Sequence, residues 1–221
     1  MLVKLKIFIT DLLFPVVCLG CGHYGQWLCP ECLKKIKLNS DGKYFQQPNI
    51  KNLNGVWIAA NYQEPFLAEA LKNFKYNGVI DLGGSLGQLL IRFLAAKISQ
   101  GEITGFDLIT AVPLTKKRRL WRGFNQAEIL AEAISRKFGW PSRFDLIKRR
   151  YQTFTQVGLK AAERQSNVKG IFQLGNEINL EGKKILLIDD VMTTGSTINE
   201  CAEILRKAGA KEIWGLVLAK N

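Results

Sequence analysis

Four of the five cysteines lie within fifteen residues, as two Cys-x-x-Cys pairs with seven residues between them. In such a pair both sulfurs turn towards one point, so two pairs can offer four thiolates to a tetrahedral metal ion. The alternatives are two disulfides, a redox pair or an iron–sulfur cluster, but the cytoplasm disfavours disulfides and a redox site needs only one pair. We therefore predict a structural Zn²⁺ in a zinc ribbon, with these ligands: Cys18, Cys21, Cys29 and Cys32.

The second group that could do chemistry is a pair of acids between an apolar run and a hydroxyl-rich turn. Ile185–Ile188 predicts a buried strand, and Asp189 and Asp190 follow it directly. Two residues later comes a turn of small or hydroxylated residues: Thr193, Thr194, Gly195, Ser196 and Thr197. Between a strand and a helix, such a turn directs backbone N–H groups at an anion. The carboxylates suit ribose hydroxyls or a divalent metal, whereas the alternative is a strand–helix turn of another doubly wound protein.

A third group joins a short loop to a run of cations. Pro113, Leu114 and Thr115 follow a predicted strand, and five of the next seven residues are basic, ending at Arg122. Such a run suits a pyrophosphate or a nucleic-acid backbone, although a solvated charged surface is the alternative. Because Arg122 lies at the turn into a predicted helix, we treat it as a candidate catalytic residue.

The segment Ile185–Thr197 closely resembles the signature of the type I phosphoribosyltransferases. This resemblance implies that Asp189 and Asp190 address the ribose hydroxyls of phosphoribosyl pyrophosphate. It also implies that residues 193–197 cradle the 5′-phosphate.

The same resemblance assigns roles to two other segments. It implies that Pro113–Thr115 approaches the pyrophosphate, which binds together with Mg²⁺. The cluster Lys148–Asn167 lies where these enzymes carry a loop that closes over the leaving pyrophosphate. Arg164 in this cluster is therefore the second candidate catalytic residue.

Over nearly its whole length the chain resembles the ComF family of competence proteins. The resemblance is carried by Leu13-Phe14-Pro15 before the first cysteine pair, Lys75-Tyr76, Arg122 to Glu128, Arg164 with Asn167-Val168, and Asp189 to Thr197. Membership implies a cytoplasmic protein with an N-terminal double zinc ribbon and an amidophosphoribosyltransferase-like domain. It also implies a link to DNA uptake during natural transformation.

Strands and helices alternate from Gly55 onwards, which predicts an α/β fold: a parallel sheet with helices on both faces. The predicted strands are 56–62, 107–112, 171–174, 184–188 and 213–218, and the predicted helices are 65–76, 82–98, 125–138 and 198–208. The polar stretch 37–54 is a linker with a short strand near Tyr44. We therefore predict a zinc ribbon domain over residues 1–54 and a type I phosphoribosyltransferase fold over residues 55–221.

Composition excludes several classes of protein. With 221 residues, 47% apolar and 23% charged, the chain can bury a core, and it is not disordered, collagenous or a coiled coil. No apolar run approaches the roughly 20 residues of a transmembrane helix. The stretch before Cys18 is interrupted by Asp11 and lacks a cleavage site, so we predict an amphipathic first helix and a cytoplasmic protein.

The basic charge is concentrated in one part of the chain. The net charge is +12, and residues 113–170 hold 14 basic and four acidic residues. Besides phosphoribosyl pyrophosphate, this segment suits single-stranded DNA, with Trp121 and Phe124 among the cations.

Three functions fit these features. The first is a phosphoribosyltransferase that works by positioning and charge, because the only histidine, His23, lies beside the cysteines, where four thiolates leave no place for it. The second is a non-catalytic module that binds single-stranded DNA and keeps the phosphoribosyl site for ligand sensing. The third is an adaptor that docks DNA-uptake proteins on the ribbon. Asp189 and Asp190 would repel a DNA backbone, so we expect a ribose-bearing small ligand in every case.

Overall fold

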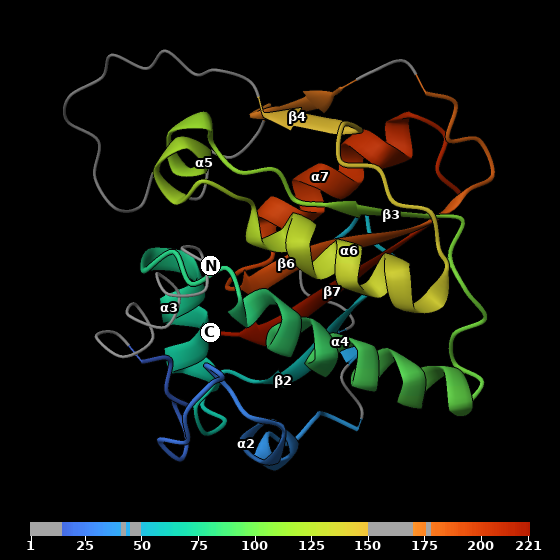
Figure 1. Cartoon of the computed structure of the whole chain (residues 1–221). Helices are drawn as coiled ribbons and strands as arrows, with labels where there is room; N and C mark the ends of the chain where they lie inside the picture. Colours follow the sequence, from blue (N-terminus) through green and yellow to red (C-terminus); the bar gives the residue numbers. More distant parts are fainter. Residues whose placement is uncertain (1–14, 41–42, 45–49, 150–169, 176–177) are drawn as a thin grey trace, which may run out of the picture.

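The computed structural model describes residues 15–40, 43–44, 50–149, 170–175 and 178–221 (Figure 1). Its centre is a five-stranded sheet with the order β1-β2-β7-β6-β3, in which β1 is antiparallel to β2 and all other neighbours are parallel. The strands are β1 (Lys43–Tyr44), β2 (Gly55–Asn61), β3 (Leu108–Ala111), β6 (Lys184–Met192) and β7 (Glu212–Lys220). The predicted α/β class, a parallel sheet flanked by helices, is confirmed.

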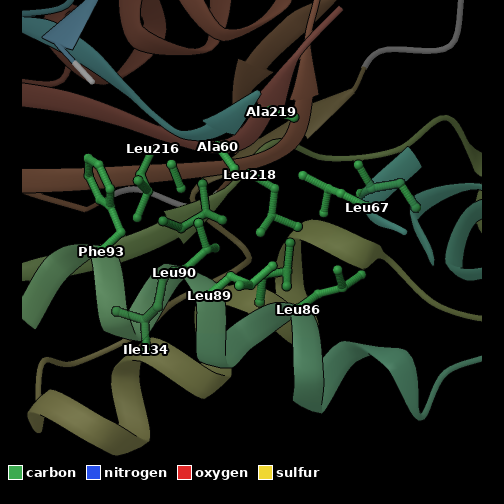
Figure 2. Close-up of a cluster of buried hydrophobic side chains, with 14 of the residues drawn as sticks. Ala60, Leu67, Leu86, Leu89, Leu90, Phe93, Ile134, Leu216, Leu218 and Ala219 are labelled. Carbon is green, nitrogen blue, oxygen red and sulfur yellow. The ribbon is translucent and has the colours of Figure 1, made fainter. Parts of the chain in front are cut away.

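Helices cover both faces of this sheet (Figure 1). On one face lie α3 (Leu67–Tyr76), α4 (Leu82–Ser99) and α6 (Gln126–Phe138), and on the other lies α7 (Ser196–Lys207). Figure 2 shows how Leu86, Leu89, Leu90 and Phe93 of α4 point towards Leu216 and Leu218 of β7. Because successive side chains of a strand face opposite sides, each inner strand contributes to both apolar layers.

Close packing of α4 on α6 depends on two glycines. A Cβ atom on Gly83 would lie 2.5 Å from Cγ2 of Ile129, and one on Gly87 would lie 2.8 Å from Cβ of Ala133. Both distances are shorter than van der Waals contact. The two helices can therefore approach as they do only because these positions lack a side chain.

The remaining elements are short. They are α2 (Pro30–Lys35), α5 (Lys116–Arg122) and a second antiparallel sheet of β4 (Ile147–Arg149) and β5 (Phe172–Leu174). Ile147 and Phe172 of the small sheet pack in the same apolar layer as Cys201 and Leu205 of α7.

Most predicted elements are present, with ends shifted by a few residues. Asn125 caps α6 as predicted, because its Oδ1 accepts a hydrogen bond from the backbone N–H of Ala127 at 3.1 Å. Glu128 differs from a capping box in that it accepts from the side-chain amide of Asn125, not from the backbone. β6 extends beyond its predicted end through both acids to Met192, because it stays paired with β7 over that length.

The basic run after Thr115 differs from its predicted conformation, and two predicted segments lie outside the described residues. The cationic run after Thr115 is a helix, α5, and not a simple turn: the Thr115 hydroxyl accepts from the N–H of Arg118, and Gly123 ends the helix with a φ of 80°. The predicted first helix and most of Lys148–Asn167, Arg164 included, lie outside the described residues.

The apolar layer of Figure 2 gives the first testable prediction. Leu90 is fully buried, so Leu90→Ala should lower the free energy of unfolding by about 2–5 kcal/mol through lost contacts and a cavity. Leu120→Ala on α5 is the matched control, because Leu120 is 75% exposed and its loss should change stability by less than about 0.5 kcal/mol. Urea unfolding of both variants measures this, and equal losses would contradict the packing described here.

Candidate functional site

Parallel pairing brings two of the predicted segments to one edge of the sheet. β3 and β6 are neighbours with Ala111 opposite Ile188, and the N–H of Val112 donates to the Ile188 carbonyl at 2.9 Å. The loop Pro113–Thr115 therefore leaves the sheet next to the acids that follow Ile188. At the carboxyl ends of parallel strands, this is where open α/β sheets bind ligands.

The turn between β6 and α7 encloses a small pocket of about 50 Å³. Its walls include the residues predicted from the sequence: Asp189, Thr193, Thr194, Gly195, Ser196 and Thr197. Gly195 has a φ of 78°, which favours glycine, and a Cβ there would lie 2.9 Å from Cδ1 of Ile50. The hydroxyls of Thr194 and Ser196 are 2.9 Å apart. A pocket of this size at the N-terminus of a twelve-residue helix suits a phosphate group.

The two acids lie on opposite faces of β6. Asp189 lines the turn pocket beside α7, whereas Asp190 makes a 2.9 Å ion pair with Lys75 of α3 on the other face. Strand alternation requires this arrangement, since adjacent side chains point to opposite sides. The structure therefore brings Asp189 together with the turn and gives Asp190 a different partner, which the sequence did not predict.

The electrostatics of the two acids differ. Burial raises the pKa of Asp189 to about 7, and the neighbouring charge of Asp190 adds to this effect. The backbone N–H of Asp190, which donates to Asp189 at 2.8 Å, and the charge of Lys75 lower the pKa in part. Asp189 therefore changes its charge close to neutral pH.

Two arginines of α5, Arg119 and Arg122, have different interaction partners. Arg119 makes a 2.6 Å ion pair with Glu128. Arg122 donates to Gln126 at 2.9 Å, and its guanidinium lies 5.3 Å from the ring centre of Tyr76. The Nε of Arg122 is buried and has no hydrogen-bond partner among the described residues. Arg122, predicted as a catalytic candidate, thus joins α5 to α3.

Arg149 lies at the end of β4 and belongs to the predicted cluster Lys148–Asn167, although no individual role was predicted for it. Burial lowers the pKa of Arg149, and the nearby positive charge of Arg118 lowers it further, while Cys201 and Glu200 oppose the change. Glu200 on α7 accepts a hydrogen bond from the N–H of Ile171 at 2.8 Å. The charges of Arg149 and Glu200 therefore influence each other on the α7 face of the sheet, and the buried Oε2 of Glu200 has no hydrogen-bond partner among the described residues.

The four N-terminal cysteines form the second candidate site. All four sulfurs lie within 4.8 Å of one another, and those of Cys21 and Cys29 are 3.6 Å apart. All five cysteines of the chain are free, so no disulfide competes with a metal here. Four Zn–S bonds of about 2.3 Å place neighbouring sulfurs just under about 4 Å apart, so this cluster fits a tetrahedral Zn²⁺. His23 is exposed and outside the cluster, as predicted.

Two backbone N–H groups donate hydrogen bonds to the sulfur of Cys18. It accepts hydrogen bonds from the N–H groups of Cys29 at 3.3 Å and Gly20 at 3.4 Å. Burial raises the pKa of Cys18, but backbone hydrogen bonds from Cys29, Gly20 and Cys21 outweigh it and lower the pKa to about 6. Burial, with the neighbouring sulfurs, raises the pKa of Cys32 to about 12. A cation at the centre would stabilise all four thiolates together.

Gly20 is required by the close approach of the chain to this cluster. A Cβ atom at this position would lie 2.6 Å from the sulfur of Cys32. Three of the cysteines are buried in the same apolar layer as Trp57 and Leu82, so the cluster packs directly on the α/β sheet and its helices.

A family model and several known proteins match this chain. A family model described as the phosphoribosyl transferase domain matches residues 125–221. Competence protein F of Haemophilus influenzae is 34% identical over 208 residues, covering 90% of this chain and 84% of that protein. DNA utilization protein YhgH of Escherichia coli is 31% identical over 207 residues, covering 90% and 88%. Competence protein ComFC of Streptococcus pneumoniae is 31% identical over 145 residues, covering 66% and 61%.

Among the described residues, no helix is both long enough and apolar enough to cross a membrane.

The cysteine cluster leads to the second prediction. Purified protein should contain about one zinc atom per chain, and Cys32→Ser should lose most of it, because three ligands hold the ion much less tightly than four. Cys201→Ala is the matched control, since Cys201 is buried on α7 and outside the cluster. Elemental analysis of the three proteins measures this. Wild-type protein without zinc, or equal zinc in both variants, would refute the assignment.

Proposed function

The chain belongs to the ComF family, and from that premise we propose that it binds phosphoribosyl pyrophosphate at the edge of the sheet formed by β3 and β6. The observation that carries the proposal is the turn pocket: a phosphate-sized space at a helix N-terminus with the half-buried carboxylate of Asp189 in its wall. A phosphate beside a carboxylate that can accept from hydroxyls is the chemistry of a phosphorylated ribose. The matching phosphoribosyl transferase family model supports the same ligand.

In this proposal each segment has one task. Backbone and hydroxyl groups of residues 193–197 hold the 5′-phosphate, and Asp189 accepts from a ribose hydroxyl. Pro113–Thr115 lies towards the pyrophosphate, and Mg²⁺ bound with that group supplies positive charge. Asp190, paired with Lys75, completes the ribose side from the other face of β6.

We propose phosphoribosyl transfer as the activity of this site. The C1′–oxygen bond to pyrophosphate breaks, and an acceptor nucleophile forms the new bond to C1′ and gives up a proton. The residues of this chain would contribute positioning and charge rather than a histidine base, because the only histidine lies beside the cysteine cluster. We also propose that the protein is cytoplasmic, because a zinc site of four thiolates needs cysteines that stay reduced.

The third prediction tests whether Asp189 binds the ribose part of the ligand and not its phosphate. Asp189→Asn should weaken binding of Mg²⁺–phosphoribosyl pyrophosphate by about tenfold or more, because a charged acceptor is lost, and should leave inorganic phosphate binding nearly unchanged. The matched control is Asp81→Asn, an exposed acid before α4 whose side chain makes no capping hydrogen bond. Calorimetric titration with both ligands distinguishes the outcomes, and equal losses for both ligands would contradict the assignment.

The same variant gives a pH test. The pKa of Asp189 is raised to about 7, so lowering the pH from 8 to 6 protonates it and removes the charged acceptor. Wild-type affinity for phosphoribosyl pyrophosphate should therefore fall by up to about tenfold over this range. In Asp189→Asn, the affinity should change with pH only as far as titration of the ligand itself requires. Parallel slopes for the two proteins would show that Asp189 is not the titrating group.

A second function is favoured by one surface observation. Leu120, Trp121 and Tyr76 are exposed at 75%, 62% and 56%, and the rings of Trp121 and Tyr76 are 6.2 Å apart beside the cations of α5. Exposed aromatic rings among cations suit single-stranded DNA. The names of the relatives, a competence protein and a DNA utilization protein, support a role in DNA uptake. We therefore propose that α5 contacts single-stranded DNA.

The fourth prediction concerns this surface. Oligonucleotide affinity should fall with salt, with a slope in log K against log salt of about −0.7 for each phosphate contacted. The double variant Lys117→Ala, Arg118→Ala should make the slope less steep by about one to two contacts. Arg136→Ala with Lys137→Ala on α6 removes the same exposed charge elsewhere and should leave the slope unchanged. Equal effects of the two double variants would mean that net charge alone, and not α5, attracts DNA.

A further inference from the structure

Residues 50–54, which lead into β2, lie against the start of α7; we call them the linker segment. Ile50 is buried in the same apolar layer as Met192 and Ile198, which lie on the two sides of the turn 193–197. Its side chain fills the space beside Gly195, because a Cβ atom there would lie 2.9 Å from Cδ1 and 3.0 Å from Cγ1 of Ile50. The linker segment therefore packs directly on the turn.

Asn199 on α7 fixes the linker segment at this point. Its Oδ1 accepts hydrogen bonds from two backbone N–H groups, that of Lys51 at 2.7 Å and that of Asn52 at 2.9 Å. The backbone N–H of Asn199 donates to the carbonyl of Gly195 at 3.0 Å. One residue therefore joins the turn to the two residues that follow Ile50.

The far end of the linker segment is held separately. Oδ1 of Asn54 accepts from the guanidinium of Arg206 at 2.9 Å and from the backbone N–H of Ile213 at 2.8 Å. Arg206 lies in the last turn of α7, and Ile213 lies in β7. This second anchor does not involve Asn199, so loss of the Asn199 contacts would release only the end of the segment that carries Ile50.

The turn has little to hold it from within. Gly195 is the N-cap residue of α7 and makes no side-chain capping hydrogen bond, and the bond from the N–H of Ser196 to the Thr194 hydroxyl is long, at 3.4 Å. This leaves N–H groups of the first turn for an anion, but it also removes the contact that usually fixes the start of a helix. Packing on Ile50 is therefore one of the contacts that order the turn.

We infer that Asn199 is a positioning residue for the phosphate site. By holding the N–H groups of Lys51 and Asn52, it keeps Ile50 against Gly195 and so keeps the turn in its anion-binding shape before the ligand arrives. A site that is ordered in advance loses less conformational entropy on binding. Asn199 does not line the turn pocket, so it acts through Ile50. This role rests on the proposed function, because the turn is the part of that site that holds the 5′-phosphate.

Asn199→Ala tests this role in the full chain, with inorganic phosphate and Mg²⁺–phosphoribosyl pyrophosphate as separate ligands. We expect both affinities to fall by a similar factor of about five- to tenfold, because both ligands use the turn and two hydrogen bonds that order it are lost. Calorimetric titration measures both affinities. An unchanged affinity for inorganic phosphate would overturn the inference.

Asn54→Ala is the matched control. It removes the same kind of side-chain oxygen, also with two N–H donors, from the other end of the linker segment. Phosphate affinity should stay within about twofold of the wild type in this variant, and urea unfolding shows whether both variants are folded and how much stability each has lost. Equal losses of phosphate affinity in Asn199→Ala and Asn54→Ala would mean that the segment contributes stability alone, which would refute the positioning role.

A double-mutant cycle tests the route through Ile50. Ile50→Ala should itself weaken phosphate binding, since it removes the side chain that packs on Gly195. Adding Asn199→Ala to this variant should weaken binding by less than about twofold more, because the contact that Asn199 maintains is already lost. Losses that multiply in full would show that Asn199 does not act through Ile50, contrary to the inference.

The two ligands separate this inference from the proposed function. Normal binding of phosphoribosyl pyrophosphate by the wild type and by Asn199→Ala alike would refute the role of Asn199 alone. An affinity for inorganic phosphate that depends on Asn199, without binding of phosphoribosyl pyrophosphate to the wild type, would support the role of Asn199 and refute the proposed function.

Discussion

The parallel pairing of β6 with β3 on one side and β7 on the other is the constraint on which the candidate site depends. A parallel sheet ends all its strands at one edge, so segments that are far apart in the chain leave it side by side. The loop after β3 and the turn after β6 are adjacent for this reason alone. If β6 ran antiparallel to β3, the acids and the loop Pro113–Thr115 would lie at opposite edges.

Because β6 is pleated, its two acids lie on opposite faces of the sheet. Asp189 faces α7 and the turn pocket, and Asp190 faces α3, where Lys75 compensates its buried charge. A buried carboxylate without a partner is costly, so α3 must place a cation at this point for β6 to carry an acid there. α3 is thus part of the site as well as a cover for the sheet.

The cysteine cluster is joined to this framework by more than apolar packing. Ser85 of α4 donates to the carbonyl of Leu28, and Arg92 of α4 donates to the carbonyl of Leu33. The buried cysteines Cys18, Cys29 and Cys32 lie in the same apolar layer as α3 and α4. Both candidate sites therefore depend on the same helical layer, the cysteine cluster through α4 and Asp190 through Lys75 of α3.

Local sequence determined the elements with strong periodicity and the residues with special chemistry. The apolar run into Asp189, the glycine and hydroxyl residues of the turn and the paired Cys-x-x-Cys spacing are all properties of short segments, so they could be predicted. α5 could not, because Lys116–Arg122 buries none of its residues and has no apolar stripe; its helix depends on a cap at Thr115 and a stop at Gly123. Only the tertiary structure decided that Asp190 pairs with Lys75, that Arg122 stacks on Tyr76 and that Asn199 accepts from the N–H groups of Lys51 and Asn52. These contacts join residues far apart in the chain, and their partners are chosen by strand register and helix packing rather than by any neighbouring residue.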